Sequence, residues 1–450
     1  MNFTEWFLFF LVIQVLHFLG TWKLYVKAGR KAWEAAIPIY NGIVLMQIIN
    51  RPKWWILLLF IPVINLLMFP IIWIETVRTF GFYKKLDSLL AIVTLGFYVF
   101  YINYATDTKH IAGRSLKPRS EFGEWVSSIT FAIIAATLVH TYFMQPFTIP
   151  TSSLEKSLLV GDYLFVSKFH YGARVPSTAV ALPMVHDSIP FTKSASYLKK
   201  PQLPYTRLPG LQNIKNNDIV CFNWPADTLA TMWGDTSGKF TYKPVDKKTN
   251  YVKRSVGIAG DSLELRNGYV YINGKKNELP DRAKIQFYYT YEAKTTINAN
   301  TFPKFLIKKE RTGVYNILSE YWNNAKVQEA IKKNGNLSKM SSDSLYTEVA
   351  GGINPDFARR LKMESVANKI NINLTEDEAI RLRKLPQTVA VTKLNFDADN
   401  TIFPHIASNK WSQDNFGPIY IPKAGATVKI DAASLPYYKQ IIKNYENNDL

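Results

Sequence analysis

Long apolar stretches are concentrated in the first 150 residues of the chain, and shorter ones follow in the remainder. A helix needs about 20 mostly apolar residues to cross the hydrocarbon core of a membrane. The stretch that begins at Phe3 predicts a transmembrane helix, because no basic residues precede it and no small-residue cleavage site follows it. Three more apolar stretches follow, at 37–49, 54–74 and 88–104.

The three inner stretches differ in how well they would span a membrane. Only 54–74 has a comfortable length. Asn41 and Gly42 interrupt the first stretch, which favours a re-entrant or interfacial segment, and 88–104 is marginal. The pattern leaves the number of spans open.

The last apolar stretch, 125–144, predicts the orientation of the chain. Basic residues precede it: Lys109, Arg114, Lys117 and Arg119. Such residues tend to remain in the cytoplasm, so everything after Pro146 is expected to be extracytoplasmic. The basic residues that follow the first helix are expected to be cytoplasmic for the same reason: Lys23, Lys27, Arg30 and Lys31.

After the membrane segments the pattern changes to short strands separated by turns, which predicts a mainly β core. The expected strands are 162–168, 218–224, 251–258, 262–265 and 269–272. From 277 to 398 the chain is more charged, with helical stretches at 319–333 and 375–384, and we expect a large inserted cap. Strand-like runs return at 417–421 and 426–430.

Charge and cysteine content narrow the classes of partner and cofactor. The net charge of +19 suggests an anionic membrane surface or nucleic acid as a neighbour. Because the cations are dispersed and the N-terminus is apolar, we expect membrane lipid and no nucleic acid. The single cysteine, Cys221, excludes an intrachain disulfide and a cysteine-based metal site, and we expect it to be a small buried core residue. The histidines have no paired spacing, so no metal or cofactor is expected.

Two stretches carry candidate chemistry. Thr151, Ser152 and Ser153 follow Pro150, which cannot continue a helix. A loop rich in hydroxyl groups is weak evidence by itself, since such residues often fill loops and helix caps. Later, Lys253 lies within an apolar strand, where alternation places it on the face of Tyr251 and opposite Arg254. One of the two cations is then expected to point inward, unless both lie on an exposed edge strand.

Together these stretches resemble bacterial type I signal peptidases (leader peptidases), serine proteases with a Ser/Lys dyad. The resemblance covers the last apolar stretch, 146–172 and 216–274. It implies that Ser153 is the nucleophile, Lys253 the general base, and Thr151 an oxyanion-hole hydroxyl beside the Ser153 backbone N–H. Ser152 matches a small spacer position. Leu154 and Lys156 stand where the family commonly has methionine and proline.

The resemblance implies a membrane-bound serine endopeptidase that removes signal peptides from exported preproteins. It would lie in the bacterial inner (plasma) membrane as a multi-pass protein, with an extracytoplasmic catalytic domain. The expected fold is N-terminal transmembrane helices followed by a mainly β (α+β) catalytic domain with a large inserted cap. The expected parts are a membrane region at 1–124, an anchor at 125–145, a catalytic core at 146–276, the cap at 277–398 and a return to the core at 399–450.

One family motif is not found in this sequence. Signal peptidases carry a Gly-Asp-Asn-Arg run near their C-terminus, so the chain is expected to be truncated there. The alternative is therefore a catalytically inactive or truncated membrane protein that binds exported chains. A self-cleaving Ser/Lys protein like certain repressors is a further reading, which the membrane segments and the lack of a DNA-binding unit disfavour.

Overall fold

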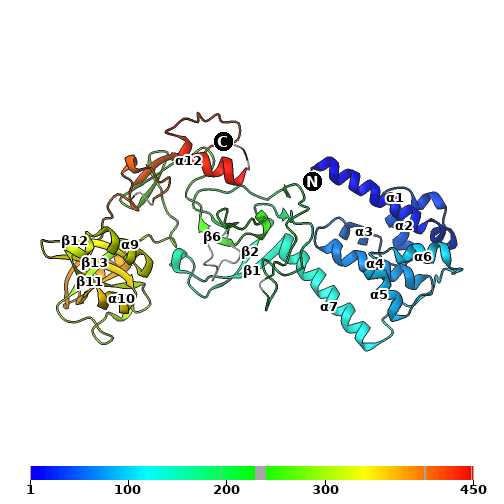
Figure 1. Cartoon of the computed structure of the whole chain (residues 1–450), viewed down its shortest axis with the longest axis horizontal. Helices are drawn as coiled ribbons and strands as arrows, with labels where there is room; N and C mark the ends of the chain where they lie inside the picture. The colour runs from blue at the N-terminus through cyan, green and yellow to red at the C-terminus, as the bar shows by residue number, and fades with distance from the viewer. Residues whose placement is uncertain (1, 193, 229–239, 400–401, 447, 449–450) are drawn as a thin grey trace. The chain divides into compact units, whose positions relative to one another are not determined.

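The computed structural model describes all residues except 1, 193, 229–239, 400–401, 447 and 449–450 (Figure 1). The chain divides into two compact units. Unit 1 comprises Met1–Thr151, Val160–Ile214 and Ile219–Arg254. Unit 2 comprises Ser152–Leu159, Lys215–Asp218 and Ser255–Leu450.

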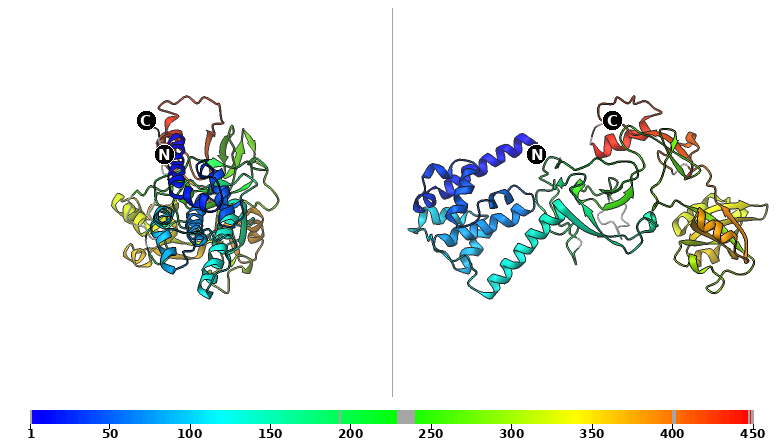
Figure 2. Two further views of the ribbon diagram at one scale, coloured as in Figure 1. Left: turned by 90° about the vertical axis from the view of Figure 1, so that its right-hand side faces the viewer. Right: turned by 180° about the vertical axis from the view of Figure 1, so that it is seen from behind.

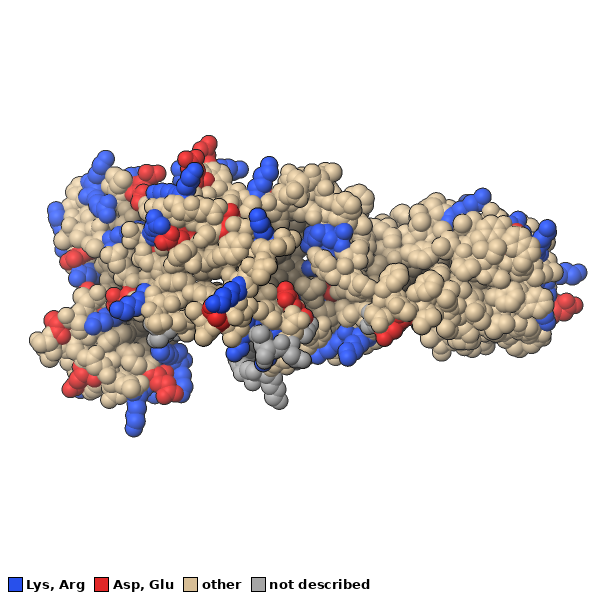
Figure 3. All heavy atoms as spheres, turned by 90° about the horizontal axis from the view of Figure 1, so that it is seen from above, with Lys and Arg blue, Asp and Glu red and all other residues tan. Residues whose placement is uncertain are grey.

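The first part of unit 1 is a bundle of apolar helices, drawn in blue and cyan (Figures 1 and 2). Its helices are α1 Phe3–Lys27, α2 Tyr40–Ile48, α3 Trp55–Leu58, α4 Ile64–Thr79, α5 Lys85–Val93, α6 Tyr98–Ala105 and α7 Glu121–Leu138, which a π-helical turn extends through Val139–Phe143. Tyr25, Met46 and Phe80 are among the side chains of its buried core. The face of this region seen in Figure 3 is mostly free of charged side chains, as expected for a surface that lipid covers.

Among the residues that the structure describes, two helices are long and apolar enough to cross a membrane, α1 and the extended α7 at Glu121–Phe143. A third span results if α5 and α6, which meet at a bend of 116°, count as one. The first expected helix and the last apolar stretch are therefore confirmed as candidate spans. The marginal stretch 88–104 is the bent pair.

The expectation that 54–74 is a comfortable span is wrong. The stretch is divided between α3 and α4, and α4 contains only 16 residues. Pro62 has no N–H for a continuous helix, and Val63 adopts a positive φ of 71° directly before α4. Apolar composition predicted one helix, whereas the backbone turns in the middle of the stretch.

The described residues in the rest of unit 1 form three two-stranded antiparallel ladders. They are β1 Met144–Thr148 with β2 Tyr163–Ser167, β3 Arg174–Val175 with β4 Thr206–Arg207, and β5 Ile219–Asn223 with β6 Asn250–Arg254. The strands expected at 162–168, 218–224 and 251–258 are confirmed, although β6 ends four residues earlier, at Arg254.

Unit 2 contains a six-stranded antiparallel sheet in the order β12-β13-β11-β14-β10-β15. Its strands are β10 Gln286–Ala293, β11 Arg311–Leu318, β12 Gly335–Ser342, β13 Tyr346–Ile353, β14 Glu364–Thr375 and β15 Thr388–Lys393. Its helices are α8 Ser319–Trp322, α9 Ala325–Asn334, α10 Pro355–Arg360 and α11 Glu376–Arg383. Tyr291, Leu306 and Ile372 are buried in the core of the sheet. The helical stretches at 319–333 and 375–384 are confirmed, but the long sheet around them was not expected; that 277–398 is an inserted cap stays a prediction.

A second sheet of unit 2 has the order β16-β7-β8-β9. Its strands are β7 Ser262–Arg266, β8 Tyr269–Ile272, β9 Lys275–Lys276 and β16 Phe416–Tyr420, and the helix α12 Leu435–Gln440 follows. The strands predicted at 262–265, 269–272 and 417–421 are confirmed. The strand predicted at 426–430 is wrong, because that stretch has no strand partner and runs into a turn at Asp431.

Candidate active site

The segment expected to hold the nucleophile lies between β1 and β2. In unit 1, the Ile149 N–H donates to the carbonyl oxygen of Asp162 at 2.9 Å. The Gly161 N–H donates to the carbonyl oxygen of Ile149 at 2.8 Å. These bonds extend the hairpin just beyond its strands. Thr151, the expected oxyanion-hole residue, is exposed at the end of this stretch.

Residues 152–159 belong to unit 2, and Ser153 is exposed in a single 3-10 turn at Ser152–Leu154. The Glu155 N–H donates to the carbonyl oxygen of Ser152 at 2.8 Å, which closes the turn. The side chains on both sides of Ser153 bind residues that follow it by more than 100 positions. These contacts are Ser152 Oγ to Glu310 Oε1, Gln286 Nε2 to Glu155 Oε2 at 3.5 Å, Lys156 Nζ to Glu378 Oε1 at 2.9 Å, and Ser157 Oγ to the Arg282 carbonyl at 3.0 Å.

Glu378 is the most strongly held of these partners. It lies in the first turn of α11, where the Thr375 N–H donates to its Oε2 at 2.9 Å. Lys309, whose side chain is only 5% exposed, approaches the same oxygen at 2.9 Å. Burial alone would raise the pKa of Glu378, but the Thr375 N–H and the ammonium groups of Lys309 and Lys156 lower it to about 2. The carboxylate is thus charged at neutral pH and can hold Lys156.

Lys253 lies on β6 of unit 1, opposite Val220 of β5. Its Nζ lies 5.8 Å from the centroid of the Tyr251 ring, and that ring packs against Trp224 at 5.2 Å. The expectation that Lys253 and Tyr251 share one face of the strand is confirmed. Lys253 is half-buried, so its aromatic neighbours shield the aliphatic part of the side chain from water.

Cys221 and Lys168 are ionisable groups of unit 1 whose charged forms burial disfavours. Burial raises the pKa of the Cys221 thiol and lowers the pKa of Lys168, whose Nζ donates to Gln145 Oε1 at 2.8 Å. Cys221 is half-buried, so the expectation that it is a buried core residue is wrong. Its strand, β5, pairs with β6 alone, so only one edge of β5 is covered by another strand.

The expected site residues are divided between the two units. Thr151 and Lys253 belong to unit 1 and Ser153 to unit 2, so the pairing of Ser153 with Lys253 stays a prediction. Within the described part of the chain, no group of three or more His, Cys, Asp or Glu side chains could hold a metal ion.

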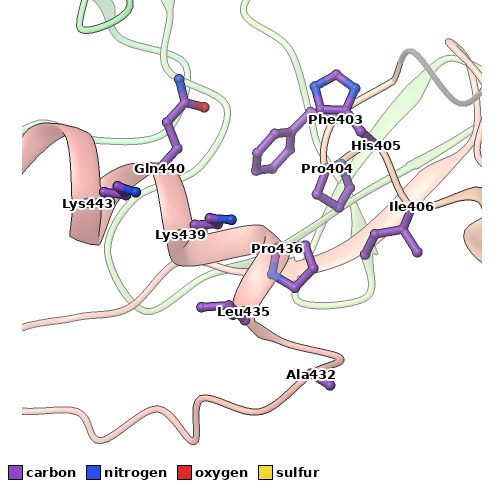
Figure 4. Close-up of a pocket in the computed structure, with 10 residues that line it drawn as sticks. All are labelled: Phe403, Pro404, His405, Ile406, Ala432, Leu435, Pro436, Lys439, Gln440 and Lys443. Carbon is purple, nitrogen blue, oxygen red and sulfur yellow. The ribbon is translucent and has the colours of Figure 1, made fainter. Parts of the chain in front are cut away.

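A pocket of about 490 Å³ lies elsewhere in unit 2, beside α12 (Figure 4). Its walls are mostly apolar, and Lys439 and Lys443 lie along one side of the helix. None of the expected site residues lines it.

Comparison with known proteins shows what the central segment is similar to. Residues 122–330 match the family described as signal peptidase, peptidase S26. This stretch, the signal peptidase segment, is similar to that family over somewhat less than half of the chain. It includes Thr151, Ser153 and Lys253, as well as Arg282, Gln286 and Glu310, which contact the 152–159 turn.

Curated relatives of this signal peptidase segment carry the name signal peptidase I. The proteins of Rickettsia massiliae and Rickettsia felis are each 30% identical over 155 residues, and that of Rickettsia prowazekii is 28% identical over 160. The matches cover 34% of this chain and 44% of the first two relatives, and 36% and 45% in the third case. The chain thus spans less than half the length of these relatives. No solved structure matches it.

Two parts of the chain lie outside the signal peptidase segment. Residues 33–112 match a family of unknown function (DUF5684). Glu378, which holds Lys156, lies beyond residue 330, and sequence reasoning missed it. The pair Thr375 and Glu378 has the spacing of a capping box, which can indicate the start of a helix but not a contact with the distant turn.

Proposed function

We propose that this chain is a membrane-bound serine endopeptidase that removes N-terminal signal peptides from exported preproteins. The match of residues 122–330 to the signal peptidase family carries the proposal, because it spans both stretches that hold the candidate chemistry. Two helices long and apolar enough to cross a membrane support the membrane attachment.

In the proposed mechanism Ser153 is the nucleophile and Lys253 the general base. A lysine accepts a proton only when it is neutral, and removal from water favours the neutral form. Lys253 Nζ would take the proton of Ser153 Oγ as that oxygen bonds to the carbonyl carbon of the scissile peptide. The Thr151 hydroxyl and the Ser153 N–H would donate to the resulting oxyanion.

Collapse of this intermediate breaks the C–N bond, and Lys253 returns the proton to the departing amine. Water then attacks the acyl ester, losing its proton to Lys253, and Ser153 Oγ leaves with a proton as the signal peptide is released. The reaction needs no metal or cofactor.

The length of chain between the membrane and the nucleophile suits this substrate class. Ser153 follows Pro146 by seven positions, so the nucleophile lies within about 25 Å of the end of the anchor, even if the chain is fully extended. A signal peptide presents its cleavage site directly after an apolar helix, at the membrane surface.

The deciding experiment is cleavage of a preprotein with an Ala-x-Ala site by the purified chain in detergent. We expect Ser153→Ala and Lys253→Ala each to abolish cleavage, and Lys253→Arg to do the same, because a guanidinium stays protonated and cannot act as the base. Ser152→Ala removes the neighbouring hydroxyl and should retain cleavage.

Cleavage that survives Ser153→Ala or Lys253→Ala would reject the dyad. A chain that binds the preprotein but does not cut it would instead support the alternative of an inactive protein that binds exported chains. Binding can be followed in the same samples by co-purification of the preprotein.

A further inference from the structure

The helical region at the start of unit 1 contacts an extramembrane loop of the same unit at two places. Val63, Ala181 and Tyr197 form one buried cluster, each 8% exposed or less. Separately, the indole Nε1 of Trp6 donates to the carbonyl oxygen of Gln202 at 3.0 Å. Both contacts reach the loop 177–202, which precedes β4.

Val63 and Trp6 each lie at the start of a helix. The region around Val63 also packs against the anchor helix α7. Val63 directly precedes α4, and Trp6 lies in the first turn of α1. The end of α3 and the first turns of α4, on either side of Val63, also pack against the end of α7, where Ile134 and Leu138 lie against the buried cluster of Leu58, Ile64 and Met68. The chain around Val63 therefore touches both the anchor and the loop.

The loop 177–202 in turn supports the segment that leads into β6. Asp246 accepts from Ser177 Oγ at 2.9 Å, and from Thr178 Oγ1 at 2.8 Å and its N–H at 3.1 Å. Lys247 Nζ lies 5.5 Å from the Tyr197 ring centroid, so the residue that packs on Val63 also contacts this segment. The strand of Lys253 begins three residues later, at Asn250.

From these contacts we propose that the N-terminal helical region, including residues 33–112, acts as a brace that holds the strand of Lys253 at a set position relative to the anchor helix. The proposal deepens the proposed protease function and rests on it for the role of Lys253. A single anchor helix leaves an extramembrane unit free to rotate about its connection. A second attachment, through Val63 and Trp6, removes that freedom and keeps the base at a defined distance from the membrane.

The contact itself is tested without any activity measurement. In a Cys221→Ser background, the pair Val63→Cys with Ala181→Cys should become cross-linked in membranes on treatment with a short bifunctional thiol reagent. The control is Arg78→Cys with Ala181→Cys, because Arg78 lies 14 residues after Ile64 on α4, about 21 Å further along the helix. Cross-linking of the first pair alone supports the brace; no cross-link in the first pair, or equal cross-linking in both, would overturn it.

The effect on catalysis is tested with Val63→Asp, which places a charge in the buried cluster. We expect kcat to fall by about tenfold to a hundredfold with KM little changed, because a misplaced catalytic group slows the chemical step. Val26→Asp is the matched control, since Val26 is 50% exposed near the other end of α1, and kcat should be unaffected. Unchanged kcat in Val63→Asp would also overturn the brace.

The two arms separate failure of the brace from failure of the proposed protease. If the unaltered chain shows no Ser153-dependent cleavage while the Val63 and Ala181 positions cross-link, the protease proposal fails and the contact stands. If cleavage depends on Ser153 but the positions do not cross-link, only the brace fails.

Discussion

Glu378 connects the turn around Ser153 to a distant part of the chain through a charge pair. Its carboxylate lies between Lys156, which is three positions after Ser153, and the buried Lys309. Removing one partner of a buried ion pair leaves the other charge without compensation, which costs far more than the loss of an exposed pair. The turn around Ser153 is therefore expected to depend on a residue outside the signal peptidase segment.

Glu378→Gln should loosen this turn. The free energy of local opening of 152–159 is expected to fall by about 3 kcal/mol, because Lys309 remains buried without its counter-charge. Hydrogen–deuterium exchange of the peptides that cover 152–159 measures the change. Glu329→Gln is the control, since its pair with Lys333 is about 70% exposed on both sides and its loss should cost under about 0.5 kcal/mol.

The same contact should depend on pH in a defined direction. The folded-state pKa of Glu378 is lowered to about 2, from a reference value of 4.5. Its stabilising effect is then complete above about pH 4.5 and is lost as the pH falls towards 2. Protection of the 152–159 amides, measured relative to their intrinsic exchange rate at each pH, should fall over this interval; unchanged protection, or an equal response to both substitutions, would contradict the role of Glu378.

Among elements, the β3–β4 ladder depends on a close approach of two chain segments. Gly172 has a φ of 80°, and a Cβ at this position would overlap the carbonyl oxygen of Leu208. Gly161, before β2, has a φ of 91°, but nothing lies within 4 Å of the place a Cβ would occupy. The two glycines thus share backbone strain and differ in packing.

Gly172→Ala should destabilise the chain more than Gly161→Ala does. Both changes incur about 1–2 kcal/mol for an alanine with positive φ, and Gly172→Ala must also separate the two segments. The measurement is the melting temperature of the detergent-solubilised chain, with Gly161→Ala as the control. Equal shifts would show that the approach of Leu208 to Gly172 is not needed for folding.

Elements differ in how well sequence pattern predicts them. The strands around Tyr163, Cys221 and Lys253 were predicted correctly because short apolar runs bounded by turn residues usually form strands. The apolar stretch 54–74 was misread, since apolar composition alone does not locate the turn at Pro62 and Val63. The strand expected at 426–430 failed because a strand requires a partner, which local sequence does not specify.

At the scale of unit 1, charge and packing together predict one orientation in the membrane. Val63 at the start of α4 contacts the loop 177–202, whereas Glu75 near the end of α4 forms ion pairs with Arg51 and Arg114. Arg114 belongs to the basic run expected in the cytoplasm. The start of α1 should then be extracytoplasmic, because Trp6 contacts the same loop at Gln202.

This orientation predicts which positions a membrane-impermeant maleimide can reach. In a Cys221→Ser background, the cysteine introduced by Thr4→Cys lies at an exposed position and should be labelled in intact spheroplasts. Lys109→Cys, also exposed, should be labelled only after the membrane is permeabilised. The reverse pattern would invert the predicted topology, and labelling of both in intact cells would show that the helices do not separate these positions across the membrane.

By itself, the sequence determined the apolar helices, most of the short strands, and the residue types and order from which Ser153, Lys253 and Thr151 were predicted. These properties depend on local periodicity and on motif spacing, which a single chain displays directly. Only the tertiary structure decided that Glu378 holds Lys156, that β16 pairs with β7, and that Val63 packs on Tyr197. Each of these contacts joins segments more than 100 residues apart, and such pairing is selected by the packing of the whole fold rather than by any local preference.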